Sequence, residues 1–227
     1  MPHANYSAQR IRALQRVSPD TAMTKNSLIV PDPMASKYWD PTVAALTESK
    51  NTYADKIASG FFSRYLGGEV VLDIGFRGGR ADAVPIIKNA IGIELDYPGY
   101  DGRRLPFHAN TVDTVYSSHC LEHIADYAGA FMDWMRVLKV GGFIVVVVPH
   151  MYLYERRTHP PSQWNQDHKR FYSPARLLRE FEESLPLSTY RVCHLRENWN
   201  PNFNYQSDLA KHASGPYEIE AVITKIA

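Results

Sequence analysis

The chain has 227 residues, 44% of them hydrophobic and 22% charged, and a formal net charge of +1. It is long enough to bury a core, and its balanced charge gives no broad attraction for nucleic acid or anionic membranes. Cys120 and Cys193 are too few for a disulfide framework, so a cytoplasmic location is expected. The longest apolar run, 143–148, is far below the ~20 residues of a membrane span. A small-molecule enzyme or a binding domain remains.

The first 35 residues are expected to form an N-terminal arm, because one short helical pattern is followed by "VPDP", whose prolines break regular structure. A single domain is expected over 36–227. Its first element is predicted to be a helix over about 41–65, since apolar residues recur on one side of it. Gly67 and Gly68 follow and indicate where it ends.

Short apolar runs and helical patterns alternate in the middle of the chain. The predicted strands are 69–74, 90–95, 111–118 and 142–149. The predicted helices between them are a short one within 79–90, interrupted by Pro85, and a longer one over 126–140. Nearly continuous apolar strands that alternate with helices indicate a parallel sheet covered on both faces.

The last part of the domain is predicted to hold one helix and two strands. The helix is expected from Ser173 or Pro174 to about Ser184, because serine is a favourable N-cap and proline a favourable first residue. The segments 187–195 and 217–226 alternate apolar and polar residues. They are predicted to pair antiparallel and close the sheet.

The stretch "VVLDIGFRGGR", residues 70–80, places Asp73 at the end of a strand and three glycines in the turn after it. Glycines allow a ligand to approach the backbone, because a Cβ would hold it away. Glu94 lies at the end of the next strand, where a carboxylate can accept both ribose hydroxyls of an adenosine. Taken alone, the glycines serve equally well as a plain strand-to-helix turn.

Further stretches follow the glycine turn in a fixed order. They are "LPF" (105–107), "TVDTVYSSHCLEHI" (111–124), "WMRVLKVGGFIVVVVP" (134–149) and the final strand pair. This set resembles the class I S-adenosylmethionine-dependent methyltransferases over about 69–225. The resemblance implies an α/β, Rossmann-like sheet, mostly parallel with an antiparallel C-terminal strand pair. It also implies S-adenosyl-L-methionine as cofactor and S-adenosyl-L-homocysteine as product.

The resemblance also implies which residues hold the cofactor. These are Asp73, Gly75, Arg77, Gly79, Glu94, Asp101, Ser118 and His119. Glu94 falls on the ribose position of the family, and Asp101 on its contact to the adenine amino group. Arg77 stands where a glycine is usual, so it either points outward, pairs with the cofactor carboxylate or obstructs the site.

The segment 96–110, between the second and third predicted strands, is too short for the helix and strand that the family places there. The family's third strand is therefore expected to be shortened or missing, which leaves the order 2-1-4-5-7-6 in family numbering. The exposed edge of such a sheet needs a cover. The N-terminal arm or a second copy of the chain is expected there, so a homodimer is one predicted assembly.

Two histidines lie four residues apart in "SSHCLEHI", at positions 119 and 123. This spacing places both on one face of a helical turn. A metal site would need a third ligand and an open position. His150 or His168 could supply that ligand, but nothing in the spacing demands it, so no metal is predicted. Glu122 and His123 are instead expected to shape the pocket.

The segment 150–172 has no regular pattern, and loops of this length usually bind or cover a ligand. His168, with Asp167 to orient it and His123 or His150 in reserve, is the predicted base for a hydroxyl acceptor. His168 would equally serve as a brace for the helix that follows. Aromatic rings and arginines in this loop suit sugars and anionic groups. The predicted substrate-binding residues are His150, Tyr154, Arg156, Arg157, Trp164 and Arg170.

The expected function is methyl transfer to a small acceptor, with a hydroxyl of a saccharide or of a phosphate- or nucleotide-linked sugar first. The shortened middle, "SSHCLEHI" and "DHKRFYSP" resemble small methyltransferases associated with surface-polysaccharide modification, which points to polysaccharide biosynthesis. Two alternatives stay open. One is a non-catalytic cofactor- or partner-binding protein, which Arg77 and the missing strand favour. The other is a nucleotide-dependent oxidoreductase, which would need a second mononucleotide-binding half.

Overall fold

The structure is a computed structural model that describes residues 37–40, 46–206 and 212–227. All of these belong to one compact unit, Pro33–Ala227. The predicted N-terminal arm, 1–35, lies outside the described residues. Within the described part of the chain, no helix is long and apolar enough to cross a membrane.

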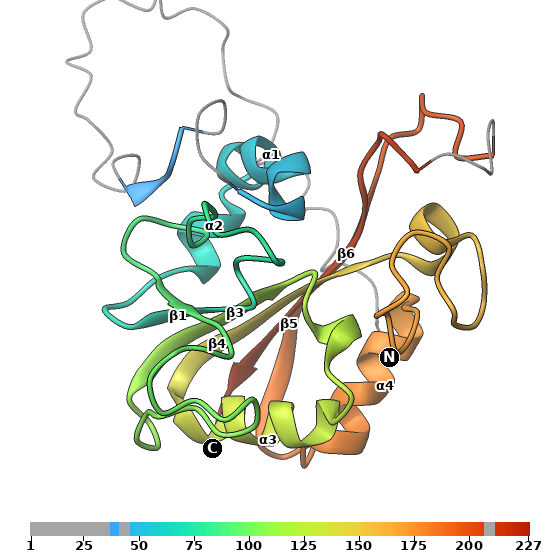
Figure 1. Cartoon of the computed structure of the whole chain (residues 1–227). Helices are drawn as coiled ribbons and strands as arrows, with labels where there is room; N and C mark the ends of the chain where they lie inside the picture. Colours follow the sequence, from blue (N-terminus) through green and yellow to red (C-terminus); the bar gives the residue numbers. More distant parts are fainter. Residues whose placement is uncertain (1–36, 41–45, 207–211) are drawn as a thin grey trace, which may run out of the picture. The chain divides into compact units, whose positions relative to one another are not determined.

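A six-stranded sheet forms the centre of this unit (Figure 1). Its strands are β1 (Val71–Ile74), β2 (Ile91–Ile93), β3 (Val112–Ser118), β4 (Leu138–Pro149), β5 (Tyr190–Trp199) and β6 (Tyr217–Lys225). They lie in the order β2-β1-β3-β4-β6-β5. The first four are parallel, and β6 is antiparallel to both of its neighbours. The predicted α/β fold and its antiparallel C-terminal pair are confirmed.

Helices cover both faces of the sheet (Figure 1). The helical segments are η2 (Glu48–Asn51), α1 (Tyr53–Ala58), α2 (Phe61–Tyr65), η3 (Leu121–His123), α3 (Tyr127–Val137), η4 (Met151–Glu155) and α4 (Pro174–Ser184). On one face α3 and α4 bury Phe131, Trp134 and Phe181. On the other, α1 and α2 bury Tyr53 and Phe62.

The apolar run of β4 explains why the sheet needs helices on both sides. Ile144 and Val146 pack into the core under α3 and α4, whereas Val145 and Val147 pack into the opposite core. Full burial of such a side chain is worth about 1.5–3 kcal/mol. A strand buried on both faces must therefore read as a continuous apolar run rather than an alternating one.

The predicted helix over 41–65 is divided in the structure. Residues 41–45 lie outside the described residues, and η2, α1 and α2 follow as separate short segments. Gly60 lies between α1 and α2 with a φ of +73°. This left-handed conformation ends a right-handed helix, and it is one that glycine adopts at little cost.

The predicted helix within 79–90 does not form, and residues 75–90 are turns and bends instead. Pro85 cannot donate a backbone hydrogen bond inside a helix. Ile86 is buried, and its backbone N–H donates to Asp73 Oδ2 at 2.6 Å. The glycine turn after β1 therefore leads into irregular chain that is fixed by a side chain of the strand.

The helix before β4 is shorter than predicted. It ends at Val137, and Leu138 already pairs with Val112 of β3. The pairing is irregular before it continues at Phe143. Gly141, with a φ of +85°, lies within this irregularity rather than at the end of the helix.

The segment between β2 and β3 contains neither helix nor strand. This confirms the prediction that the family's third strand is shortened or missing here. Side chains of α3 satisfy its backbone instead. The Arg136 guanidinium donates to the carbonyls of Phe107 (2.8 Å) and Leu105 (3.0 Å). Asp133 accepts a hydrogen bond from the Leu105 N–H at 2.7 Å. Buried backbone groups without such partners would be costly, so these contacts replace the missing strand pairing.

Candidate active site

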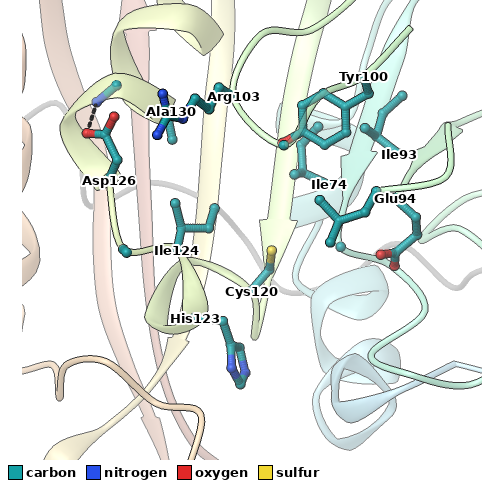
Figure 2. A pocket seen from close by; sticks show the side chains of 15 residues that line it. Ile74, Ile93, Glu94, Tyr100, Arg103, Cys120, His123, Ile124, Asp126 and Ala130 are labelled. Carbon is teal, nitrogen blue, oxygen red and sulfur yellow. Dashed lines mark hydrogen bonds between the residues drawn. The ribbon is translucent and has the colours of Figure 1, made fainter. Parts of the chain in front are cut away.

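A cavity of about 460 Å³ lies at the carboxyl ends of β1, β2 and β3, within the range of about 300–1,000 Å³ typical of small-molecule sites. Its walls are mainly apolar and include Ile74 and Ile124. Figure 2 shows Glu94 and Asp126 on opposite sides of this cavity, with Cys120 between them. The carboxyl end of a parallel sheet is where open α/β folds bind their ligands.

Gly75 and Cys120 form one wall of the cavity together. Gly75 has a φ of +74°, and its N–H donates to the Ile93 carbonyl at 2.8 Å. A Cβ on Gly75 would overlap the Cys120 side chain, with the Cys120 Cβ only 2.7 Å away. Burial raises the pKa of Cys120 to about 12, so this residue is a neutral thiol at physiological pH and not a nucleophile.

Glu94 is oriented by the glycine turn. Its Oε1 accepts a hydrogen bond from the Arg77 backbone N–H at 2.7 Å. The Arg77 guanidinium pairs with the exposed carboxylate of Asp96, and Arg77 does not contribute to the cavity lining. The residue at the unusual position of the motif therefore fixes Glu94 through its backbone, while its side chain lies elsewhere.

Only some of the predicted cofactor residues line the cavity: Gly75 and Glu94 do, whereas Gly79, Ser118 and His119 do not. Asp101 is exposed and accepts hydrogen bonds from the N–H groups of Arg103 and Arg104, while its neighbours Tyr100 and Gly102 line the cavity. The sequence analysis did not single out Tyr100, Arg103, Cys120 and Asp126, which also line it.

Asp73 is fully enclosed next to the cavity rather than exposed in it. Its carboxyl accepts the Ile86 N–H, and the side chain is not among the cavity-lining groups. Burial raises the pKa of Asp73 to about 7, and the nearby charge of Glu94 adds to the increase. Asp73 thus connects the strand to the irregular chain after the glycine turn.

A group of histidines surrounds a buried carboxylate at the edge of the cavity. Glu122 Oε1 lies 3.9 Å from each of three ring nitrogens. These are His119 Nδ1, His123 Nε2 and His168 Nε2. We call these four residues the histidine cluster. His123 is the member that also lines the cavity.

The long loop after β4 delivers His168 to this cluster. The Lys169 N–H donates to the Glu122 carbonyl at 2.8 Å, which fixes the loop against η3. His168 Nδ1 is hydrogen-bonded to the buried carboxylate of Glu155, which in turn accepts from Ser162 Oγ at 2.5 Å. Asp167, the residue predicted to orient His168, has an exposed side chain. Glu155 could not be identified from the sequence, because nothing in the neighbouring residues distinguishes it from a solvated acid.

His119 connects the cluster to the last strand. Its Nε2 lies 3.2 Å from Glu218 Oε1, and Lys56 Nζ lies 2.8 Å from Glu218 Oε2. Although burial opposes it, the Lys56 ammonium and His119 hold the pKa of Glu218 well below its usual value. Burial likewise works against a charged His119, but the Glu218 carboxylate raises the pKa of His119. Desolvation lowers the pKa of His123, which has no such pairing.

His150 and the aromatic residues of the loop form a packed wall. His150 Nδ1 accepts from the N–H groups of Tyr152 (3.1 Å) and Leu153 (3.2 Å), so it caps η4. Tyr154 packs against His168 with ring centroids 5.8 Å apart, and Trp164 Nε1 donates to the Tyr154 carbonyl. Of the two aromatic residues predicted for substrate, Tyr154 therefore contacts the histidine cluster, and Trp164 contacts Tyr154.

The arginines of the loop are placed differently. Arg157 donates to the Pro161 carbonyl on the surface. Arg170 pairs with Glu180 at 2.8 Å and lies 4.7 Å from the Tyr127 ring centroid. Arg156 follows η4 with a left-handed φ of +53°. None of the three lines the cavity.

Comparisons with known proteins agree with this fold. A protein-family model described as a methyltransferase domain matches residues 81–146. A structure of the Haloferax volcanii Trm112 methyltransferase activator with a protein named as a methyltransferase is similar, with a TM-score of 0.53, 16% identity, and coverage of 79% of this chain and 91% of that chain. No curated protein matches the sequence.

Two further solved structures share the fold. An S-adenosylmethionine-dependent methyltransferase from Mesorhizobium loti has a TM-score of 0.50 and 15% identity over 82% of this chain and 100% of that chain. The [4+2]-cyclase SpnF has a TM-score of 0.51 and 14% identity over 84% and 87%. The fold is therefore that of Rossmann-like methyltransferases. The matching family model is that of a methyltransferase domain, and the Mesorhizobium protein is named as dependent on S-adenosylmethionine.

Proposed function

We propose that the chain transfers a methyl group from S-adenosyl-L-methionine to a hydroxyl of a small acceptor. One observation carries this proposal: the cavity at the carboxyl ends of β1 to β3 is bounded by Gly75 and Glu94 and meets the histidine cluster at His123. A cofactor site and a group of proton-accepting side chains are thus contiguous. The family match to a methyltransferase domain supports the same reaction.

The cavity walls suit the two parts of an adenosine. Ile74, Ile93 and Ile124 offer an apolar surface for the adenine ring. Glu94 is held in place by the Arg77 N–H and offers a carboxylate to the ribose hydroxyls. Cys120, a neutral thiol, packs against Gly75 and closes this end of the cavity beside the turn. We place the methionine end of the cofactor toward this turn.

Transfer to an oxygen requires that the acceptor lose a proton. The oxygen lone pair forms the new C–O bond, the S–C bond breaks with its electrons returning to sulfur, and the O–H proton leaves. We assign this proton loss to the histidine cluster, with His123 next to the acceptor and His168 in contact with it at a ring-centroid distance of 4.8 Å. Asp167 contributes through a backbone hydrogen bond to His123. The protein's main contribution is to align acceptor and methyl group.

The acceptor class follows from the loop after β4. Tyr154 contacts the cluster and Trp164 contacts Tyr154, and aromatic faces of this kind bind the apolar faces of sugar rings. A saccharide, free or linked to a phosphate or nucleotide, is therefore the proposed acceptor. In this proposal His150 holds the loop in place, and the three arginines lie in the outer part of the same loop. If the acceptor is a saccharide hydroxyl, the reaction is an O-methylation, and we propose a role in polysaccharide biosynthesis.

A second candidate function is cofactor or partner binding without methyl transfer. The irregular chain at 75–90 favours it, because the turn after β1 lacks the helix N-terminus that commonly faces a cofactor. The fold also hosts other chemistry, as the cyclase shows. One of the similar structures is a complex with an activator protein, and β2 lies at the edge of the sheet. A second copy of this chain is the partner that we propose there.

The test is a calorimetric titration of the purified protein with S-adenosylmethionine, S-adenosylhomocysteine and NAD, followed by mass spectrometry of incubations with sugar acceptors. We expect the first two ligands to bind with dissociation constants in the micromolar range, and we expect a methylated sugar. Cofactor binding with no methylated product from any hydroxyl acceptor would favour the second candidate. Binding of NAD in preference to the sulfonium ligand would contradict both.

A further inference from the structure

Glu122 is a buried acid without a counter-charge in direct contact. Its side chain has no exposed surface, and within the described residues neither carboxylate oxygen has a hydrogen-bond partner. An isolated buried carboxylate is among the most costly groups a fold can contain. The ring nitrogens around Oε1 are 3.9 Å away, too far for a hydrogen bond but close enough to share a small ion.

The donor atoms around this space have the separation of metal ligands. One atom each from Glu122, His123 and His168 lies within 4.8 Å of the others. His123 Nε2 and His168 Nε2 are both 3.9 Å from Glu122 Oε1. Ligands bound at about 2.1 Å in a tetrahedral site lie roughly 3.4 Å apart. Small side-chain rotations would therefore bring all three atoms into coordination distance.

The two histidines are already held as metal-binding histidines usually are. A ligating histidine commonly gives its other ring N–H to a carboxylate or a carbonyl, which fixes the tautomer. His168 Nδ1 is bonded to Glu155, so Nε2 carries the lone pair that faces Glu122. His123 is held by the backbone of Asp167 and also turns its Nε2 toward Glu122.

The charges around the cluster also favour a cation. The carboxylates of Glu122, Glu155 and Glu218 are all fully or almost fully buried. Lys56 is the ammonium that pairs with Glu218, and it is shared with Glu220 at 3.4 Å. The lysine thus offsets acids at one end of the network, whereas the basic groups that the described residues place within 4 Å of Glu122 are imidazoles. A divalent cation would supply the missing positive charge.

We propose that Glu122 Oε1, His123 Nε2 and His168 Nε2 bind a divalent transition-metal cation, with Zn²⁺, Fe²⁺ and Co²⁺ as the matching class. Two imidazoles and one carboxylate suit these ions, whereas Ca²⁺ and Mg²⁺ prefer oxygen ligands. Three protein ligands leave a position for a further oxygen ligand, as in catalytic metal sites. Since His123 lines the cavity, that position lies next to the proposed acceptor.

With the cation bound, the cluster would promote loss of the acceptor's proton to water instead of accepting that proton itself, and this consequence rests on the proposed function. A hydroxyl bound to a divalent cation has a lowered pKa. Its proton passes to solvent water, its oxygen lone pair forms the C–O bond with the methyl group, and the S–C electron pair returns to sulfur. The histidines then act as ligands, and the cation makes the hydroxyl a nucleophile.

The test uses untagged full-length protein, freed of metal with a chelator and titrated with Co²⁺ under visible absorption, then with Zn²⁺ in competition. We expect one Co²⁺ per chain, with the intense visible bands of a site of low coordination number. Glu122→Gln should weaken Co²⁺ binding by roughly 100-fold or more, since even the loss of an outer-shell partner costs about 10–100-fold. His108→Gln, at an exposed histidine outside the cluster, should bind as the unaltered chain does.

Thermal unfolding keeps the proposal testable if Glu122→Gln should fold poorly. Zn²⁺ should raise the Tm of the unaltered chain, and should not raise that of His123→Ala, whose side chain is partly exposed and tolerates truncation. The absence of stoichiometric Co²⁺ binding, or equal binding by Glu122→Gln, would overturn the site. S-adenosylmethionine is titrated in parallel: Co²⁺ binding without cofactor binding supports the site and removes the proposed function. Cofactor binding without Co²⁺ binding removes the site alone.

Discussion

Two long connections follow parallel strands and border the same site, but they are built in different ways. The chain after β1, residues 75–90, is a series of turns whose glycines adopt positive φ values, and it contacts the cavity chiefly through Gly75. The loop after β4, residues 150–172, is held by buried side-chain pairs such as His168 with Glu155. The first connection presents backbone, and the second presents imidazole and carboxylate groups.

The carboxyl ends of the parallel strands can therefore contact two ligands in two different ways. A backbone surface accommodates a ligand by its shape, because a single Cβ would exclude it. A side-chain surface selects by charge and proton chemistry, because buried polar groups must be satisfied. Substitutions in the first connection should therefore change cofactor binding and stability, whereas those in the second should change cation binding.

Asp73→Asn should give the largest effect, as a change in pH dependence. Burial raises the folded-state pKa of Asp73 to about 7, so the folded chain keeps a proton that the unfolded chain releases near pH 4. The contribution of this carboxyl to the free energy of unfolding is full below about pH 4, and it is lost as the pH rises toward 7. In the unaltered chain this carboxyl should lower the free energy of unfolding by about 4 kcal/mol as the pH rises from 4 to 8, and Asp73→Asn should lack that decrease. Urea unfolding at several pH values measures it.

Asp101→Asn is the matched control for that measurement. The N–H groups of Arg104 and Arg103 lower the pKa of this exposed acid, so its small contribution has the opposite sign and rises with pH. Identical pH profiles for Asp73→Asn and the unaltered chain would contradict the buried, protonated Asp73.

Gly75→Ala should lower the free energy of unfolding by about 3 kcal/mol. Alanine is strained in the left-handed conformation of this residue, and its Cβ would overlap Cys120. Urea unfolding at constant pH measures it. Gly79→Ala is the control, because Gly79 also has a positive φ but its added Cβ would meet no atom within 4 Å. It should cost only about 1–2 kcal/mol. Equal losses would show that the approach of Gly75 to Cys120 is unimportant.

Glu94→Ala should weaken S-adenosylmethionine binding by about 2–3 kcal/mol, since a carboxylate that accepts ribose hydroxyls forms charge-assisted hydrogen bonds. Calorimetric titration gives the dissociation constants. Asp82→Ala serves as the control, because Asp82 is an exposed acid that pairs with Arg80 in the same connection. An unchanged affinity in the Glu94 variant would remove Glu94 from the cofactor site.

Glu155→Gln should have the smallest effect, a roughly 10–100-fold loss of Co²⁺ affinity, because an amide no longer fixes the His168 tautomer as a carboxylate does. Absorption titration measures it. Glu197→Gln is the control, since Glu197 forms a similar pair with His150 at 2.8 Å but outside the cluster. If both variants bind Co²⁺ equally well, Glu155 does not position a ligand.

Much of the fold could be predicted from the sequence. Continuous apolar runs such as 143–148 identify strands buried on both faces, whereas the sheet order was implied by the resemblance to the methyltransferase family. The helix within 79–90 was wrongly predicted, because a tertiary contact, the Asp73 bond to Ile86, overrides the local pattern. The break at Gly60 was likewise missed, since a glycine inside an amphipathic pattern does not reveal its φ.

The site was only partly predictable. Gly75 and Glu94 follow strands, so the pattern places them at the sheet edge, and both line the cavity. The meeting of Glu122 with His168 depends on the path of a loop with no regular structure, and on one backbone hydrogen bond from Lys169. The spacing of His119, Glu122 and His123 was a usable signal, but His168, the further ligand, lies too far along the chain for spacing to select it over His150.

The pairing of Lys56 with Glu218 has a consequence for biosynthesis. It joins a helix near the beginning of the described chain to β6, a strand near its end that lies between β4 and β5 in the sheet. During translation Glu218, the partner of this lysine, is synthesised 162 residues later. The layer formed by α1 and α2 therefore completes its packing only after β6 has left the ribosome. Until then the side of β4 that pairs with β6 is exposed to chaperones and to aggregation.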